Sequence, residues 1–310
     1  MLPLVSVIMP AYNAEKYIGS AIDSIVHQTY ENWELIIVED CSTDGTLRII
    51  KSYDDSRIRV VNNKKNCGIA YSTNYGIDLA NGKYIALMDD DDIAVKERLE
   101  LQVDYLEVHT HIDILGGRSD IMDESGNVIR YGQVPRYNPK YIKSILLFKC
   151  MDFKNGTTMI RKEFIEQHNL CYKENCYGMQ DFKFFIESSK LGNISALSDL
   201  LLYYRKHQNN ETKRRVTEFK EQRRQKYAEF QRESLQASGY KLKENQLAII
   251  NKALAGSDGR CDNRKELELL FEAFCEIMRQ AREMKSDYYT ELEHCCKDML
   301  SDQVKKMIHF

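Results

Sequence analysis

The chain has 310 residues, of which 43% are apolar and 29% are charged, and its formal net charge is −3. This composition excludes a disordered chain, and the small net charge gives no indication of nucleic-acid binding. The length suits one sizeable α/β domain with a smaller addition. The nine cysteines include no C-x-x-C pair, which predicts reduced thiols rather than disulfides or a zinc site.

Strands and helices alternate along the first third of the chain. Apolar runs typical of strands occupy residues 5–9, 34–38, 58–61 and 83–88, and helical patterns occupy residues 15–28, 46–53 and 69–80. Pro10 is expected to end the first strand. Short connections between alternating strands and helices predict a doubly wound α/β fold with a mostly parallel sheet flanked by helices.

The pattern becomes less regular after residue 92. Helices are predicted at 95–109, 140–148, 164–168 and 180–190, strands at 112–115 and 194–204, a turn leading into a strand at 155–161, and a hairpin at 120–130. Helical periodicity dominates after Asn210, with apolar stripes over 216–230, 267–278 and 288–304. We therefore expect an α/β domain over residues 1–210 and an all-helical extension over residues 211–310.

Four consecutive carboxylates, Asp89–Asp92, follow the predicted strand 83–88. If the strand continues, Asp89 and Asp91 point to one side and Asp90 to the other. Two oxygen ligands on one side suit Mg²⁺ or Mn²⁺, and a solvated acidic loop is the alternative. A calcium loop of the EF-hand kind fits poorly, because Ile93 and Ala94 stand where an oxygen ligand and a glycine are needed.

Other polar residues follow the neighbouring strands, at Tyr12–Asn13 and at Glu39–Asp40. Parallel α/β sheets bind ligands beyond the carboxyl ends of their strands, so we expect these residues to converge with Asp89–Asp92 in one crevice. The sequence has neither G-x-G-x-x-G nor a P-loop, which argues against dehydrogenases and P-loop NTPases.

The ordered set of motifs along the first 210 residues resembles the family 2 glycosyltransferases, which have the GT-A fold. The segments that carry this resemblance are Val5–Asn13, Gln28–Tyr30, Trp33–Asp40, Ser42–Thr46, Asn66–Gly68, Asn74–Ile77, Gly82–Ile85 and the Asp-x-Asp of Asp89–Asp91. The resemblance implies an inverting, metal-dependent enzyme that moves a hexose or N-acetylhexosamine from a UDP-sugar to a glycan or lipid-linked acceptor. Residues 1–110 would then bind the nucleotide sugar and residues 111–210 the acceptor.

The resemblance also implies roles for individual residues. Asp91 would bind a divalent cation, Mn²⁺ or Mg²⁺, and His207 would lie at the metal or diphosphate, unless it is an ordinary surface histidine. Asp181 would be the catalytic base, and its alternative role is that of a helix N-terminal acid. The residues expected to bind the nucleotide sugar are Pro10, Tyr12, Asn13, Glu39, Asp40, Asn66, Asp89 and Asp90.

Partners and location follow from charge and hydropathy. The segment 205–232 holds ten Lys or Arg residues against four Glu residues, with aromatic residues interleaved. It would either lie on an anionic membrane or pack on the α/β domain or a second subunit. No apolar run reaches the roughly 20 residues of a membrane span and no signal peptide is recognised, so we expect a cytoplasmic protein, soluble or peripheral on the inner face of the membrane.

Two other functions compete with sugar transfer. A nucleotidyltransferase that makes nucleotide sugars would need a glycine-rich phosphate loop after the first strand, where this chain has Pro10–Asn13. A non-catalytic scaffold with the same fold would be expected to have lost its acids, whereas Asp89, Asp91 and Asp181 are all present.

Overall fold

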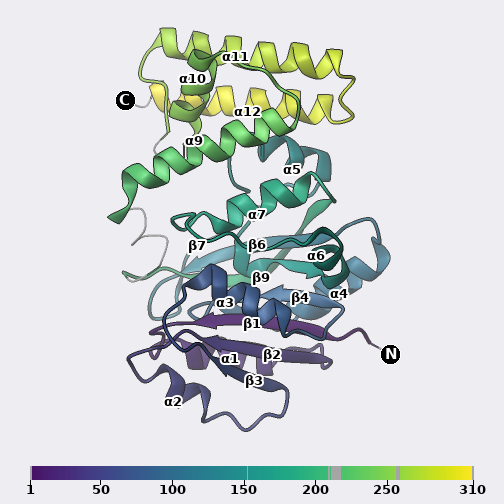
Figure 1. Cartoon of the computed structure of the whole chain (residues 1–310), viewed down its shortest axis with the longest axis vertical. Coiled ribbons are helices and arrows are strands. Elements are labelled where there is room, and N and C mark those ends of the chain that lie inside the picture. Colours follow the sequence, from purple (N-terminus) through teal and green to yellow (C-terminus); the bar gives the residue numbers. More distant parts are fainter. Residues whose placement is uncertain (1, 152, 209, 211–217, 256–258, 309–310) are drawn as a thin grey trace. The chain divides into compact units, whose positions relative to one another are not determined.

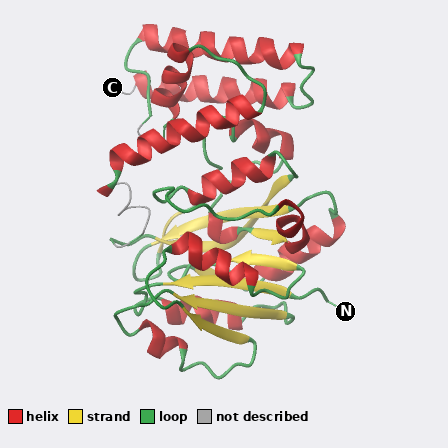
Figure 2. Ribbon diagram, viewed as in Figure 1, coloured by secondary structure: helices red, strands yellow, loops and turns green. Residues whose placement is uncertain are grey.

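The computed structural model of the chain describes residues 2–151, 153–208, 210, 218–255 and 259–308 (Figure 1). It divides into two compact units. The first comprises Met1–Tyr137, Asp152–Asn175 and Leu191–Asn210, and the second comprises Asn138–Met151, Cys176–Lys190 and Glu211–Phe310. Strands lie in the first unit, and the second is helical (Figure 2).

The described strands of the first unit form one nine-stranded mixed sheet, in the order β3-β2-β1-β4-β8-β6-β9-β5, with β7 paired to β6. Its parallel part consists of β1 (Val5–Ala11), β2 (Trp33–Glu39), β3 (Ile58–Asn62) and β4 (Tyr84–Leu87). The other strands are β5 (Ile93–Ala94), β6 (Ile114–Met122), β7 (Val128–Arg130), β8 (Met159–Arg161) and β9 (Ile194–Arg205). Antiparallel β8 joins the two halves, because it pairs with both β4 and β6.

Helices cover both faces of the parallel part, as the strand–helix alternation predicts. Helices α1 (Ile18–Val26) and α4 (Arg98–Val108) share one apolar core with Val5, Val7 and Met9 of β1. On the opposite face, α3 (Ile69–Asp78) lies so close to β1 that a side chain at Gly76 would collide with Ile8. The short helices α2 (Thr46–Ile50), η1 (Asn155–Thr157) and α6 (Lys162–His168) complete this unit.

The second unit contains α5 (Pro139–Ile145), α7 (Gln180–Ser189), α9 (Lys220–Ala237), α10 (Glu244–Leu254), α11 (Arg264–Glu283) and α12 (Tyr289–Ile308). Aromatic pairs join its segments. The rings of Phe148, after α5, and Phe274 of α11 lie 5.3 Å apart, and those of Phe182 in α7 and Tyr227 in α9 lie 5.2 Å apart. The helices α5 and α7 therefore share a core with the C-terminal helices. The division at residue 210 stays a prediction.

The mixed α/β fold with C-terminal helices is confirmed, and three local expectations are wrong. Pro10 does not end β1, which continues to Ala11. Its missing N–H is tolerated because β4 pairs with β1 only as far as Ile8. Strand β4 stops at Leu87, so the alternation assumed for Asp89–Asp92 does not apply. Helix α10 was not predicted, because its buried residues include adjacent pairs rather than one clean stripe.

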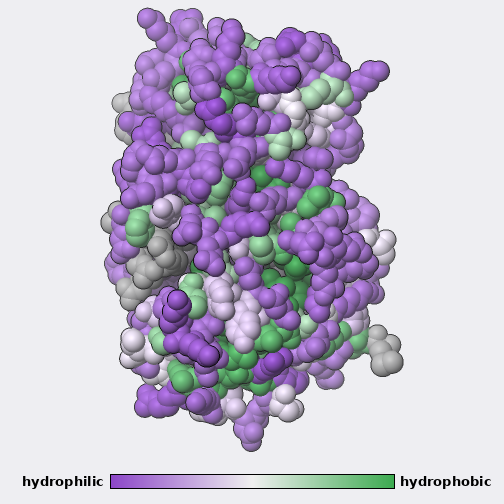
Figure 3. Space-filling view, in the orientation of Figure 1, coloured by the Kyte–Doolittle hydropathy of each residue, from purple (hydrophilic) through white to green (hydrophobic). Residues whose placement is uncertain are grey.

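The surface agrees with the charged composition. Most of the face seen in Figure 3 is hydrophilic, and hydrophobic residues appear on it in small groups. Among the described residues, no helix is both long enough and apolar enough to cross a bilayer. Residues 211–217, which include part of the predicted 216–230 stripe and of the basic segment 205–232, lie outside the described residues.

Candidate active site

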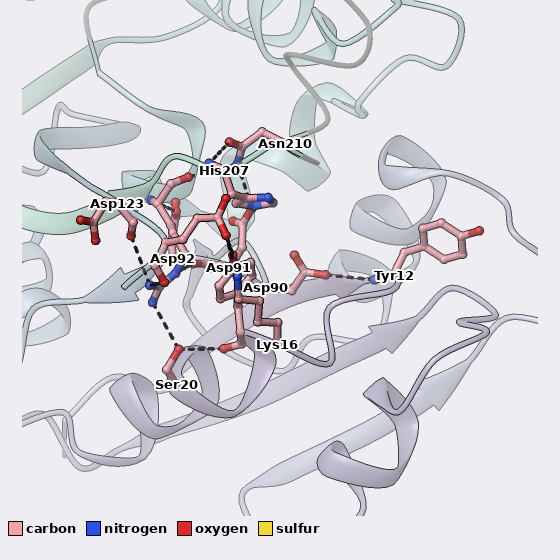
Figure 4. A network of polar contacts seen from close by, with 12 residues as sticks. Tyr12, Lys16, Ser20, Asp90, Asp91, Asp92, Asp123, His207 and Asn210 are labelled. Carbon is pink, nitrogen blue, oxygen red and sulfur yellow. Dashed lines mark hydrogen bonds and ion pairs between the residues drawn. The ribbon is translucent and has the colours of Figure 1, made fainter. Parts of the chain in front are cut away.

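The four acids Asp89–Asp92 form a turn between β4 and β5, at the carboxyl end of β4. Each carboxylate has a different environment, as Figure 4 shows for three of them. Asp90 accepts a hydrogen bond from the backbone N–H of Tyr12 at 3.0 Å. Loss of water around its carboxyl group, and then repulsion from Asp91, raise the pKa of Asp90 well above its ordinary value, although the residue is partly exposed.

Asp91 and His207, the two predicted metal ligands, lie side by side. The Nε2 atom of His207 is 2.7 Å from Oδ2 of Asp91 (Figure 4). Asn210 links the two residues, because its Nδ2 donates to Asp91 Oδ2 at 3.1 Å and its Oδ1 accepts from the His207 N–H at 2.7 Å. His207 and Asn210 thus meet the carboxylate of Asp91, although they lie 116 and 119 positions from it in the chain.

Asp92 is fully buried and fastens the acidic turn to the end of β9. Its Oδ1 accepts from the Arg205 N–H at 2.8 Å, and its Oδ2 has no hydrogen-bond partner among the described residues. Burial and the charge of Asp91 raise the pKa of Asp92 well above its ordinary value. The guanidinium of Arg205 donates to the backbone carbonyls of Asp91 and Glu124, so Arg205 holds loops together here.

A second buried arginine, Arg98, lies at the base of the acidic turn. Its Nη2 donates to the carbonyl of Leu87, the last residue of β4, at 2.7 Å, and its Nε donates to Gln102. Burial lowers the pKa of Arg98 to about 10, while attraction to Asp89 and Asp92 opposes that shift. Arg98 remains charged at neutral pH and provides positive charge close to the acids.

The segment after β1 is fixed by the segment after β2. Asn13 has a left-handed backbone, with φ of 51°, and its Oδ1 accepts from the Thr43 N–H at 2.8 Å. The next N–H, of Ala14, donates to Thr46 Oγ1 at 2.7 Å. Tyr12 is 40% exposed and its ring points away from the acidic turn (Figure 4). The ring is therefore accessible for stacking against a flat ligand.

The acids after β2, Glu39 and Asp40, are buried, and both bind backbone amides. Glu39 accepts from the N–H groups of Cys41 and Ser42, while Asp40 accepts from those of Cys67 and Gly68 at 2.8 Å and from the Asn63 side chain. These acids hold the loops that surround the predicted base site. The exposed Asn66 lies on the loop that Asp40 fastens.

The turn η1 lies next to Asp89, because a Cβ on Gly156 would be only 3.1 Å from Asp89 Oδ2. A chain of hydrogen bonds supports this turn from α3. The Asn74 side chain pairs with both the N–H and the C=O of Tyr172 at 2.8 Å, and the Tyr172 hydroxyl donates to Asn155 Oδ1 at 3.1 Å. Asn74 therefore positions η1 through Tyr172.

Asp181 belongs to the second unit and lies in the first turn of α7, as predicted. Its Oδ1 accepts the N–H of Phe182 at 2.8 Å. The residues just before this helix have unusual backbones, with φ of 51° at Tyr177 and 75° at Gly178. The carbonyl of Tyr177 is bound by Arg223 Nη1 at 2.6 Å, which helps to hold this strained entry to α7.

The donor atoms suit a cation that is shared with a substrate. Asp91 and His207 supply an oxygen and a nitrogen next to each other. No group of three His, Cys, Asp or Glu side chains arranged to hold a metal occurs in the described part of the chain. Mg²⁺ sites commonly use one or two carboxylates, with substrate phosphates and water completing the shell, so two protein donors fit such an ion.

The sequence indicated most of the acids of this site but not the residues that hold them in place by hydrogen bonds. Asp92, Arg98 and Asn210 had no role in the predictions, although they hold the acidic turn and its histidine in place. Asp92 was visible as the fourth acid of the run. Arg98 and Asn210 carried no local signal, because only the fold brings them to the turn.

The fold and its acids define the class of α/β proteins with a Rossmann-like sheet, which bind ligands beyond the carboxyl ends of their parallel strands. The particular family follows from comparison. Residues 6–168 match the model of glycosyl transferase family 2, and the chain belongs to this family and is a glycosyltransferase.

Two relatives illustrate the range of the family. The chain is 37% identical over 217 residues to an uncharacterized glycosyltransferase of Haemophilus influenzae, and the match covers 67% of each chain. It is 30% identical over 195 residues, 63% of this chain and 73% of the relative, to the Escherichia coli UDP-Glc:alpha-D-GlcNAc-diphosphoundecaprenol beta-1,3-glucosyltransferase WfgD.

Solved structures share the fold at low sequence identity. Staphylococcus aureus TarS, residues 1–349 in complex with UDP-GlcNAc, matches with a TM-score of 0.60 and 19% identity, over 97% of this chain and 92% of that one. The Pyrobaculum calidifontis mannosyltransferase PcManGT, in complex with GDP-Man and Mn²⁺, matches with a TM-score of 0.58 and 17% identity, over 99% and 88%.

Proposed function

We propose that this glycosyltransferase moves a hexose or N-acetylhexosamine from a UDP-sugar to a hydroxyl of a glycan or lipid-linked acceptor, with inversion and with a divalent cation. The observation that carries this proposal is the pairing of Asp91 with His207 at the end of β4, beside Asp89 and Asp90. The names of WfgD and TarS, which mention UDP-Glc, a diphosphoundecaprenol acceptor and UDP-GlcNAc, support the donor and acceptor classes.

The cation would supply charge stabilisation to the departing diphosphate. Asp91 and His207 would hold it, and the Mn²⁺ in the PcManGT complex supports this choice of ion. Asp89 would approach the ribose, and Tyr12 would stack on the base. Asp40 and Glu39 would fix the loops around the base and ribose through their backbone contacts.

UDP and Mn²⁺ together are expected to stabilise the full chain against thermal unfolding. At 100-fold excess over the dissociation constant the gain is about 2.7 kcal/mol. Asp91→Asn should remove the Mn²⁺-dependent part of the rise in Tm, because it weakens the ligand at the cation. Asp104→Asn, at a residue exposed on α4, is the control and should respond as the wild type does. An unchanged Tm at millimolar UDP and Mn²⁺ would contradict the proposal.

Asp181 would remove the proton from the acceptor hydroxyl. Asp181→Asn is therefore expected to lower the rate of sugar transfer about 10²–10⁴-fold. The rise in Tm with UDP and Mn²⁺ should persist in this variant, because the substitution leaves the proposed nucleotide contacts in place. Transfer can be measured as UDP release in a screen of UDP-sugars and acceptors. Wild-type turnover by the variant would exclude Asp181 as the base.

A further inference from the structure

An arm of the first unit, residues 128–137, exposes an unusual number of large apolar side chains. It comprises β7 and the segment that follows it. Val128, Ile129, Tyr131, Val134 and Tyr137 are 40%, 55%, 79%, 58% and 68% exposed. All three residues of β7 are exposed, so neither face of this strand is covered by the described chain. Scattered apolar residues are normal on a protein surface, but five within ten positions indicate a contact surface.

The arm is held firmly to the sheet, although its side chains face outward. Its strand pairs with β6, and the Gly132 N–H donates to the buried carboxylate of Asp120 at 2.9 Å. Gly132 passes so close to Ser119 that a Cβ would lie only 1.9 Å from the Ser119 carbonyl oxygen. At the far end, Ser195 Oγ donates to the Tyr137 carbonyl at 2.7 Å. The fold therefore presents these apolar groups from a fixed backbone.

The charge of the arm is entirely positive. Residues 128–137 include Arg130 and Arg136 and no acid. The nearest upstream acids are engaged within the protein: Glu124 pairs with Lys16 at 2.6 Å, and Asp123 accepts backbone N–H groups of its own turn. Tyrosine and arginine beside aliphatic residues suit the boundary between water and lipid, where anionic headgroups attract the arginines.

A second copy of the chain fits this arm less well. A two-fold symmetric contact would bring identical surfaces together and place the arginines of one copy near those of the other. Strand β7 has only three residues and is followed by Pro135, which makes it a poor template for pairing with another strand. Both features argue against a second copy of the chain, and the arginines favour an anionic partner.

We propose that the arm 128–137 docks on an anionic lipid surface. The apolar and tyrosine side chains would enter the boundary between headgroups and acyl chains, and the exposed Arg130 would contact lipid phosphates. Such docking would bring the site to a lipid-linked acceptor, and this role rests on the proposed function. The lipid binding itself does not depend on it.

Flotation of the full chain with vesicles tests the proposal. Wild-type protein should float with vesicles that contain phosphatidylglycerol, bind vesicles of pure phosphatidylcholine more weakly, and lose binding as salt increases. Ile129→Ser/Tyr131→Ser/Val134→Ser should weaken binding to both vesicle types at least about tenfold. Arg130→Gln should weaken binding about fivefold only where phosphatidylglycerol is present. Val108→Ser/Leu191→Ser, which changes exposed apolar residues elsewhere in the first unit, should bind as the wild type does.

Several outcomes would overturn the proposal that the arm 128–137 docks on lipid. These are failure of the wild type to bind phosphatidylglycerol vesicles, unchanged binding by both arm variants, or a concentration-dependent dimer that the triple variant abolishes without vesicle binding. The response of Tm to UDP and Mn²⁺ separates this inference from the proposed function. If the wild type fails to bind vesicles but its Tm still rises with UDP and Mn²⁺, only the lipid-docking proposal is overturned. If it binds vesicles but its Tm does not respond to UDP and Mn²⁺, only the proposed function is overturned. A retained UDP response also shows that a variant is folded.

Discussion

At the scale of single residues, the acidic turn contains carboxylates of two kinds. Asp91 faces His207 and can share a ligand with it, whereas Asp92 is buried and holds the backbone of Arg205. Adjacent residues of the same type thus have different chemistry because of their surroundings. A run of four identical letters cannot show this difference, since it depends on contacts that Arg205, His207 and Asn210 bring to the turn.

Substitutions at Asp92 should separate its hydrogen bond from its charge. Asp92→Ala leaves the buried N–H of Arg205 without an acceptor and is expected to lower the free energy of unfolding by about 1–3 kcal/mol. Asp92→Asn keeps an acceptor oxygen and cannot take the charged form that burial and Asp91 disfavour, so it should change this free energy by less than about 1 kcal/mol. Urea unfolding at neutral pH without divalent cations measures both values. Equal losses in the two variants would contradict this division.

At the scale of elements, the parallel half of the sheet was predictable, and the second half was less so. The β1–β4 segments alternate with helices at a regular spacing, so their parallel direction and an expected ligand site at their carboxyl ends follow from general rules. Strand β9 instead pairs with both β6 and β5, and its register against β6 shifts near Gly117 and Arg118. Such irregular pairing joins distant segments and leaves no periodic pattern in either of them.

The support of η1 by α3 can be tested at Asn74. Asn74→Ala removes two hydrogen bonds to the backbone of Tyr172 and should lower the free energy of unfolding by about 1–3 kcal/mol. Because Tyr172 positions Asn155, the variant should also raise the KM for the donor. Asn66→Ala is a matched control at an exposed position and should change stability by less than about 0.5 kcal/mol. Chemical denaturation compares the two, and similar losses would refute the positioning role.

At the scale of the whole molecule, the sequence suggested a boundary near residue 210 because composition changes there. By its contacts, the second unit also includes residues 138–151 and 176–190, which come before this boundary. Its C-terminal helices share a core with α5 and α7, which come from the middle of the chain. Composition reports where local patterns change, but it does not report which distant helices bury one another.

Truncation after Asn210 tests which division governs folding. The shortened chain would expose Phe148 and Phe182, whose aromatic partners are Phe274, Tyr227 and Phe230. We expect it to aggregate or to elute as large species, because each buried phenylalanine contributes about 1.5–3 kcal/mol through burial. Size-exclusion chromatography of the truncated and full chains measures the outcome. A soluble, cooperatively unfolding monomer of residues 1–210 would instead establish the boundary predicted from composition.

The buried Arg98 gives the acid-rich edge a counter-ion that is part of the chain itself. Folding and cation loading can therefore be separate events, because positive charge is present beside the acids before any ion arrives. A chelator would then strip the proposed ion from an intact fold. One metal-free preparation could be loaded with Mg²⁺ or Mn²⁺ in turn, which allows the ions to be compared on the same molecules.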